Sequence, residues 1–172
     1  MGKIADSNMN TTDEKRDYWT TALTSGAVSG IILAAYMAIL YASGDTALPI
    51  LGLVQYLILS FGINHSQTAW KKRKEDASYG SLLLIGLVCG ISASLFVDLY
   101  SMIYMKVLNP SFADETMEMM DTMQLSAYGY SREQLRSMIV PSMPISITII
   151  YSIITLLLSA FSALLTNMKK RK

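Results

Sequence analysis

One acid in this chain could carry chemistry, because it lies inside a long apolar run. Asp98 falls within residues 81–108, which are otherwise almost entirely apolar. A helix of that length rises about 40 Å, more than the roughly 30 Å hydrocarbon core of a bilayer. An ionisable side chain inside a span is costly and is typical of proton or cation relays. The alternative is a structural acid near the outer end of the helix, hydrogen-bonded to a tyrosine or paired with Arg132 or Arg136.

Three methionines form a second candidate group. Met117, Met120 and Met123 recur every third residue within an acidic segment. Their thioethers have the chemistry and spacing to bind copper(I) outside the cytoplasm. The alternative, which we favour because no cysteine or histidine is near, is adaptable apolar packing of an amphipathic helix. We therefore expect no metal and no other cofactor.

Polar residues in two other segments follow helical spacing. Gln55 shares a predicted helix face with Gly52 and Gly62, so we expect it to point into the bundle. Hydroxyl residues near the carboxyl end recur in alternating steps of four and three, which predicts a helix–helix seam. The alternative is the polar lining of a solute path. The series is Thr148, Ser152, Thr155, Ser159, Ser162 and Thr166.

The composition excludes several classes of protein. Hydrophobic residues make up 52% of the chain, which is typical of a membrane domain rather than a soluble one. The net charge of +1 does not favour nucleic-acid binding, and the single cysteine, Cys89, cannot form a disulfide within the chain. Nothing resembles a nucleophile–base pair, a phosphate-binding loop or a metal triad, so we expect no enzyme.

The apolar segments predict an all-α, polytopic membrane protein. Four spans are expected, at residues 20–41, 47–63, 81–108 and 142–166. They form one domain over residues 18–168, with an extracytoplasmic amphipathic helical hairpin at 111–140. Residues 1–17 are predicted to be a disordered cytoplasmic tail, and residues 169–172 a basic cytoplasmic terminus.

Small residues recur every fourth position on two of these spans, which predicts close helix packing. The ridges are Ala22, Gly26, Gly30 and Ala34 on the first span, and Gly86, Gly90 and Ser94 on the third. Asp98 is the next step of the second ridge. Both ridges contain the pattern G-x-V-x-G-I, which indicates either two related helical hairpins or chance likeness between apolar segments.

The distribution of basic residues predicts the orientation. An even number of spans places the amino terminus, residues 71–74 and the carboxyl terminus on one side, with eleven of the fourteen lysines and arginines. Such an excess is typical of cytoplasmic loops, so we expect a bacterial inner-membrane protein with both termini in the cytoplasm. Lys71, Lys72, Arg73 and Lys74 are also expected to attract anionic lipid.

Several short segments resemble the domain-of-unknown-function family 4199 from about Tyr18 to the end of the chain. They are Tyr79-Gly80-Ser81, Ile103-Tyr104, Asn109-Pro110-Ser111-Phe112, Gly129-Tyr130-Ser131-Arg132-Glu133, Met138 to Pro141, and the terminal basic cluster. The resemblance implies a small four-span inner-membrane protein, typical of Bacteroidota-type bacteria. It implies no activity and no catalytic residues.

Two functions fit these patterns. We favour a structural or accessory subunit that packs through its small-residue ridges against another membrane protein or a second copy of itself. The alternative is a small ion-coupled transporter, acting as an oligomer, with Asp98 as the intramembrane acid.

Overall fold

Four long helices dominate the computed structural model, which describes residues 2–43, 49–112, 114 and 132–168, with most side chains from residue 15 onward. The helices are α1 (Gly2–Ser43), α2 (Pro49–Arg73), α3 (Tyr79–Ile103) and α5 (Arg132–Met168), and a π-helical turn, η1 (Tyr104–Leu108), extends α3. The described residues are therefore all-helical, as the sequence predicts.

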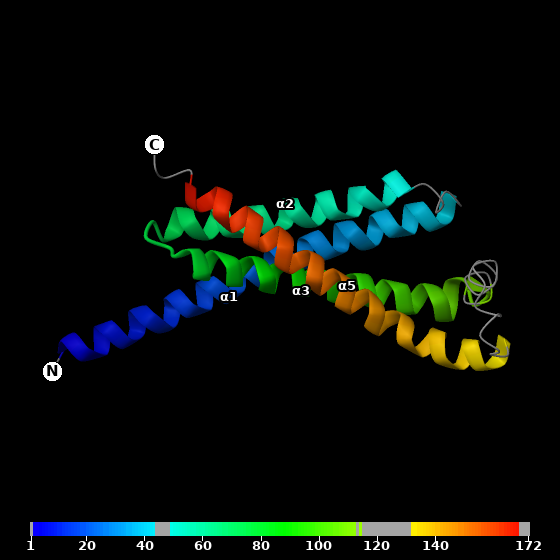
Figure 1. The fold of residues 1–172 in the computed structure, drawn as a ribbon. Helices are drawn as coiled ribbons and strands as arrows, with labels where there is room; N and C mark the ends of the chain where they lie inside the picture. Colours follow the sequence, from blue (N-terminus) through cyan, green and yellow to red (C-terminus); the bar gives the residue numbers. More distant parts are fainter. Residues whose placement is uncertain (1, 44–48, 113, 115–131, 169–172) are drawn as a thin grey trace.

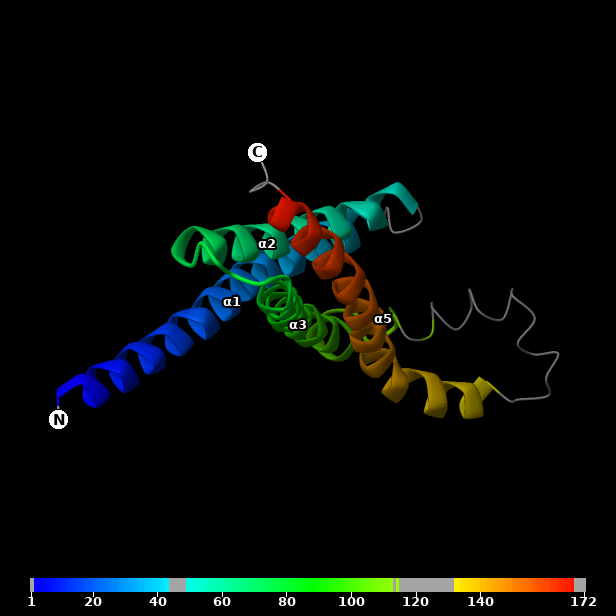
Figure 2. The same ribbon diagram turned by 60° about the vertical axis from the view of Figure 1, so that its left-hand side comes forward.

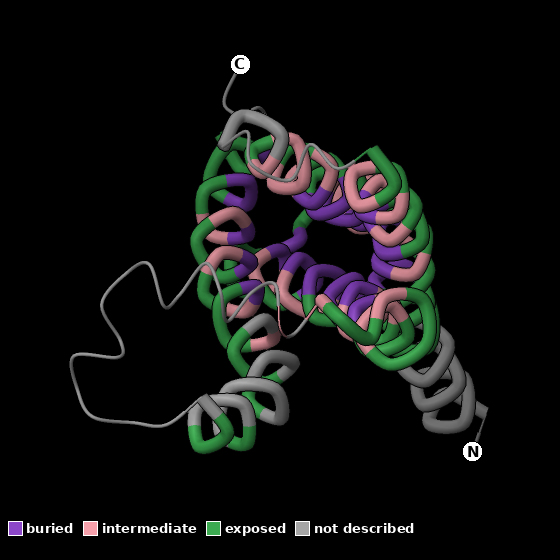
Figure 3. The backbone as a smooth tube through the Cα atoms, turned by 90° about the vertical axis from the view of Figure 1, so that its right-hand side faces the viewer, coloured by how far each residue is buried: buried purple, intermediate pink, exposed green. Residues whose placement is uncertain are grey.

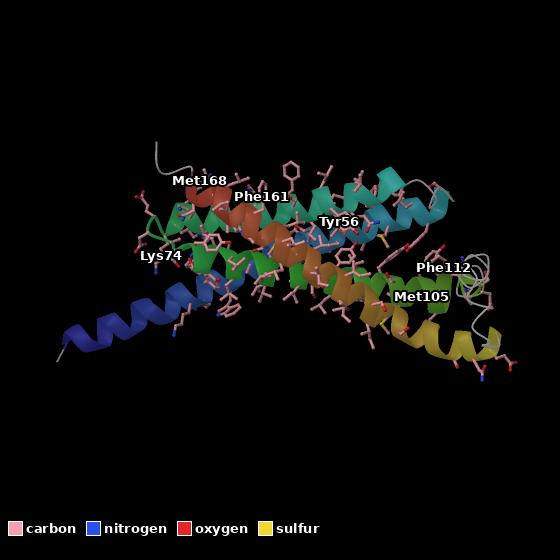
Figure 4. All side chains as sticks on the ribbon, viewed as in Figure 1. Tyr56, Lys74, Met105, Phe112, Phe161 and Met168 are labelled. Atoms are coloured by element: carbon pink, nitrogen blue, oxygen red, sulfur yellow. The ribbon has the colours of Figure 1, made fainter. Side chains whose placement is uncertain are left out.

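The helices are arranged as a bundle around a central pair (Figure 1). α2 and α3 contact each other and both of the other helices, whereas α1 and α5 lie on opposite sides of this pair. α1 and α3 run in the same direction, and α2 and α5 run in the opposite one. Lys74 and Met168 therefore lie at one end of the bundle, and Met105 and Phe112 at the other (Figure 4).

Three helices are long and apolar enough to cross a membrane. They are Lys15–Ser43, Tyr79–Leu108 and Thr148–Met168. α2 is not among them, because its described part is interrupted by Gln55 and becomes polar from Asn64. Viewed along the bundle, buried residues face inward and exposed ones outward (Figure 3). The exposed residues include many large aliphatic side chains, as expected of a surface that meets lipid.

Residues 2–17, which were expected to be a disordered tail, form the first turns of α1 in the structure. This part of α1 projects beyond the other helices, as Figure 2 shows most clearly. No glycine or proline occurs between Lys3 and Ser25. Because extending an existing helix is far easier than starting one, the helix of the span continues back through the polar residues.

α2 ends ten residues later than predicted, at Arg73 rather than at residue 63. The polar residues after Ile63 do not break the helix, since Ser66, Gln67 and Trp70 are buried against the other helices. The predicted basic loop is consequently the last turn of α2, followed by Lys74. Cations in that position complement the negative end of the helix dipole.

α5 is continuous from Arg132, so the predicted break before the fourth span is wrong. Pro141 and Pro144 were expected to separate a short hairpin helix from the span. The helix instead bends in this region, between its yellow and orange parts in Figure 1. A proline in a helix removes one backbone donor and kinks the chain without always ending the helix. Most of the rest of the predicted hairpin, residues 115–131 with Met117, Met120 and Met123, lies outside the described residues.

The ridge on α1 packs against the backbone of α3. A Cβ atom added at Gly26 would lie 2.6 Å from Ser92 Cβ, and one added at Gly30 would lie 2.8 Å from Phe96 Cβ. Both distances are shorter than any contact that real Cβ atoms make. Glycine is therefore required at both positions for the two parallel helices to approach this closely.

The ridge on α3 faces different helices. A Cβ atom at Gly90 would lie 2.6 Å from Thr155 Oγ1 on α5, and one at Gly86 would lie 2.5 Å from Gln67 Nε2 on α2. If α1–α2 and α3–α5 were related by two-fold symmetry, both ridges would meet at the α1–α3 contact. The two ridges share a sequence pattern, but their packing does not repeat.

We predict that Gly90→Ala destabilises the protein by about 1–3 kcal/mol, the usual cost of overpacking. The new methyl group would lie 2.9 Å from Thr155 Cβ, which cannot rotate away, so α3 and α5 would have to separate. Gly52→Ala is the matched control, because nothing lies within 4 Å of a Cβ there and alanine favours helix. Thermal unfolding of both variants in detergent tests this, and equal midpoints would contradict it.

Candidate functional site

Asp98 is bound by a hydroxyl group of α5. Thr148 Oγ1 donates a hydrogen bond to Asp98 Oδ2 at 2.6 Å. The other carboxylate oxygen, Oδ1, is buried and has no hydrogen-bond partner among the described residues. The acid thus lies at the α3–α5 contact with one oxygen bound and the other available inside the protein.

A second polar pair lies one helical turn further along α5. Tyr151 is buried and donates its hydroxyl hydrogen to Gln55 Oε1 on α2 at 2.5 Å. Thr148 and Tyr151 are three residues apart and share a face of α5. We call the four side chains of Gln55, Asp98, Thr148 and Tyr151 the Asp98 cluster. Gln55 points into the bundle, and the cluster joins α2, α3 and α5.

Aromatic residues indicate the depth of Asp98. At one end of the bundle Tyr18 donates a hydrogen bond to the carbonyl of Ser81, and at the other Tyr41 stacks on Tyr104 with 4.4 Å between ring centroids. Aromatic residues gather at both surfaces of a membrane. Asp98 lies about 25 Å along α3 from Ser81 and about 3 Å before Tyr100, which also stacks on Tyr41. It therefore lies at the inner edge of the second aromatic layer.

The side chains of Arg132 and Arg136, which were expected as possible partners of Asp98, lie outside the described part of the structure. The described partner of Asp98 is Thr148 on α5.

The hydroxyl seam of α5 faces the inside of the bundle. Thr155 and Ser159 are completely buried, and Ser159 Oγ donates to the carbonyl of Leu83 on α3 at 2.7 Å. Asn64 on α2 donates to Ser162 Oγ at 3.1 Å. Ser152 is half-buried and donates to the carbonyl of Thr148 in its own helix.

The remaining ridge residues are placed as follows. Ala22 is completely buried in a cluster with Trp70 and Leu82, and Ala34 is half-buried. Ser94 is buried and donates to the carbonyl of Ile91 in its own helix. Together with the glycine contacts, these positions show that the chain's own helices cover most of the two ridges.

Gln67 is a polar centre that the sequence reasoning missed. Its side chain is completely buried, and Nε2 donates to the carbonyls of Leu82 on α3 and Ser159 on α5, each at 3.0 Å. Polar residues after Ile63 suggested the end of a span. The sequence signal was the stripe Leu59, Ile63, Gln67 and Trp70, which keeps one helical face going past the polar run.

Buried polar atoms without described partners extend along the bundle interior. They are Gln67 Oε1, Trp70 Nε1, Asp98 Oδ1, Ser101 Oγ and Thr155 Oγ1. Leaving such an atom unsatisfied costs about 1–3 kcal/mol, and lipid cannot supply a hydrogen bond. The interior is therefore more polar than helix packing alone requires. Among the described residues, no group of three or more histidine, cysteine or acidic side chains could hold a metal ion.

The comparisons place residues 24–167, most of the chain, in one family. The matching family model is described as "Protein of unknown function (DUF4199)". No curated protein and no solved structure matches the chain.

We predict that Gln67→Met lowers the stability of the protein by about 1–3 kcal/mol, because the hydrogen bonds from Nε2 to Leu82 on α3 and Ser159 on α5 are lost in a buried site. The control is Thr68→Val, the next residue on α2, which is only partly buried and should change stability by less than about 0.5 kcal/mol. Unfolding midpoints of the two variants in the same detergent give the comparison. A Gln67→Met protein as stable as the control would show that these bonds do not hold α2 in place.

Proposed function

The chain belongs to the family of proteins of unknown function DUF4199, and we propose that it is a small ion-coupled membrane protein. In this proposal four helices span a bacterial inner membrane, both termini lie in the cytoplasm, and Asp98 binds a proton or a monovalent cation. The proposal includes no catalytic activity.

The direction of the helices supports four spans. α1 and α3 are apolar enough to cross a membrane and run in the same direction. The chain between them must therefore return across the bilayer, and α2 is the helix that does so. Its 25 residues rise about 37 Å, and its polar residues Ser66 and Gln67 are buried against neighbouring helices. A fourth span can therefore be less apolar than the other three.

The charges at the two ends of the bundle support the orientation. Lys74 lies at the end where α5 finishes, with the rest of the basic turn at residues 71–74 (Figure 4). Asp17 lies 3.8 Å from Arg73, so its neighbours Lys15 and Arg16 are at the same end, and the sequence adds four more basic residues after α5. Moving this end across the membrane would translocate three basic clusters, whereas the other end carries few cations.

One observation carries the ion-coupling proposal. Asp98 lies at the inner edge of an aromatic layer, bound on one oxygen by a hydroxyl donor, with no cation among its described partners and a buried second oxygen. An acid in such a place is either protonated or neutralised by a bound cation, so its charge state depends on what occupies it. The polar interior of the bundle supports the same function.

The accessory-subunit hypothesis depended on the two small-residue ridges as the surface that binds a partner. Gly26, Gly30, Gly86 and Gly90 contact the chain's own helices and cannot also receive a partner. A partner would have to bind the exposed aliphatic faces, which any lipid-facing bundle presents. An accessory role and self-association therefore stay predictions. A pull-down from detergent with mass spectrometry tests them, and a stable stoichiometric partner would favour this role.

We predict that a cysteine at position 170 is labelled only from the cytoplasmic side. The variants Lys170→Cys and Ser111→Cys are made in a Cys89→Ala background, since Cys89 is the only native cysteine. A membrane-impermeant maleimide added to spheroplasts should modify the cysteine at the exposed position 111 and leave position 170 unmodified until the membrane is broken. Labelling of position 170 in intact spheroplasts would reverse the orientation.

We predict that Asp98→Asn abolishes ion movement and keeps the fold, because the amide still accepts the bond from Thr148 but cannot ionise. The measurement is proton flux into dye-loaded vesicles under a potassium diffusion potential, repeated with a sodium gradient. The ion flux of the wild type should exceed that of Asp98→Asn by at least tenfold, a factor that corresponds to about 1.4 kcal/mol. Asp76→Asn, at an exposed site outside the bundle interior, is the control.

The same experiment can contradict the proposal in two ways. Wild-type protein that moves neither protons nor sodium above empty vesicles would refute ion coupling. If Asp98→Asn also fails to form a monodisperse bundle, Asp98 is a structural acid.

A further inference from the structure

A groove on the outside of the bundle separates α1 from α2. Its volume is about 580 Å³, within the range of small-molecule sites. The two helices touch at its floor, where a Cβ atom at Gly62 would lie 2.8 Å from Ser29 Cβ. Val28, Ile32 and Phe61 line it and are at least half exposed, so the groove opens toward the surroundings.

The groove is apolar at one end and polar at the other. Along α1, Thr24 precedes Val28 and Ile32, and along the antiparallel α2, Phe61 precedes His65. Thr24 and His65 therefore lie together at the end nearer the basic turn of α2. From Thr24 to Ile32 the groove extends about 12 Å along the membrane normal.

His65 is the hydrogen-bond donor available at the polar end. Thr24 already donates its hydroxyl hydrogen to the carbonyl of Thr20 at 2.6 Å. His65 is exposed and makes no hydrogen bond with any residue that the structure describes. Its ring N–H can therefore be donated to a ligand oxygen.

In the basic turn, Lys72 is the cation that can bind a ligand on the membrane-surface side of His65. Lys71 donates to Asn167 on α5 at 2.8 Å, and Arg73 lies 3.8 Å from Asp17 on α1. Lys72 is exposed and has no ion pair or hydrogen bond within the described part of the chain. Because it follows His65 by seven residues, it lies on the same face of α2, about 10 Å nearer the membrane surface.

We propose that this groove binds one anionic phospholipid. An acyl chain lies over Val28, Ile32 and Phe61, His65 donates to an oxygen of the ester region, and Lys72 pairs with the phosphate. The sequence of apolar, donor and cationic groups along the membrane normal matches a phospholipid from tail to headgroup. A helix from a second copy of the chain is the alternative occupant, and the oligomeric state of the groove variant below distinguishes it from a lipid.

The headgroup is tested by native mass spectrometry of the full-length protein in detergent, with phosphatidylglycerol and phosphatidylcholine added at equal concentration. Wild type should retain one phosphatidylglycerol per chain about fivefold better than phosphatidylcholine. Lys72→Gln should remove this preference, since one lysine near an anionic surface is worth about a fivefold change in affinity. Lys71→Gln is the matched control and should keep it, because Lys71 is bound to Asn167.

The acyl-chain site is tested with a groove-filling variant. Val28→Trp should lose both lipids. Leu95→Trp, on the outer surface of α3, should keep them, since the two positions are 58% and 60% exposed and tolerate a large side chain equally. Matching unfolding midpoints establish that both variants are folded.

Three results would overturn the proposal. Equal retention of the two lipids by wild type would show that the groove does not recognise the anionic headgroup. Phosphatidylglycerol that stays bound to Val28→Trp would place the lipid elsewhere. A wild-type dimer that Val28→Trp converts to a monomer would show that a second copy of the chain fills the groove.

Discussion

The structure depends on the close approach of helix backbones at glycine. Lipid tails are as apolar as leucine, so helices inside a bilayer gain little by hiding apolar surface and associate through tight packing and polar contacts. Gly26 and Gly30 bring α1 against α3, Gly62 brings α2 against Ser29 of α1, and Gly90 brings α3 against α5. At the α3–α5 contact, short side-chain hydrogen bonds then become possible.

Those short hydrogen bonds make the interior of the bundle polar. Gln67 joins α2 to α3 and α5 near one end, and Thr148 joins α5 to Asp98 toward the other. Polar groups cannot face the lipid without cost, so burial between helices is their most favourable position. The same burial leaves Asp98 Oδ1 without a described partner and makes this carboxylate the best candidate for ion binding.

Because the small residues pack between the chain's own helices, the outer surface has few positions at which a partner helix could approach closely. The ridges that would suit a helical partner are covered, and the exposed faces are mainly aliphatic. The α1–α2 groove differs from these faces in having a polar end beside Lys72. A phospholipid has the same order of groups, from an apolar tail to a charged headgroup.

The sequence by itself determined the helical class, the apolar segments and the family, because these depend on composition and on residues near one another in the chain. It also indicated that Gln55 and the hydroxyl seam face inward, since helical spacing decides which residues share a face. Spacing does not decide which helix that face meets. Only the tertiary structure showed that the two ridges have different partners, that Gln67 is buried, and that Asp98 accepts a hydrogen bond from Thr148, because each depends on contacts between distant segments.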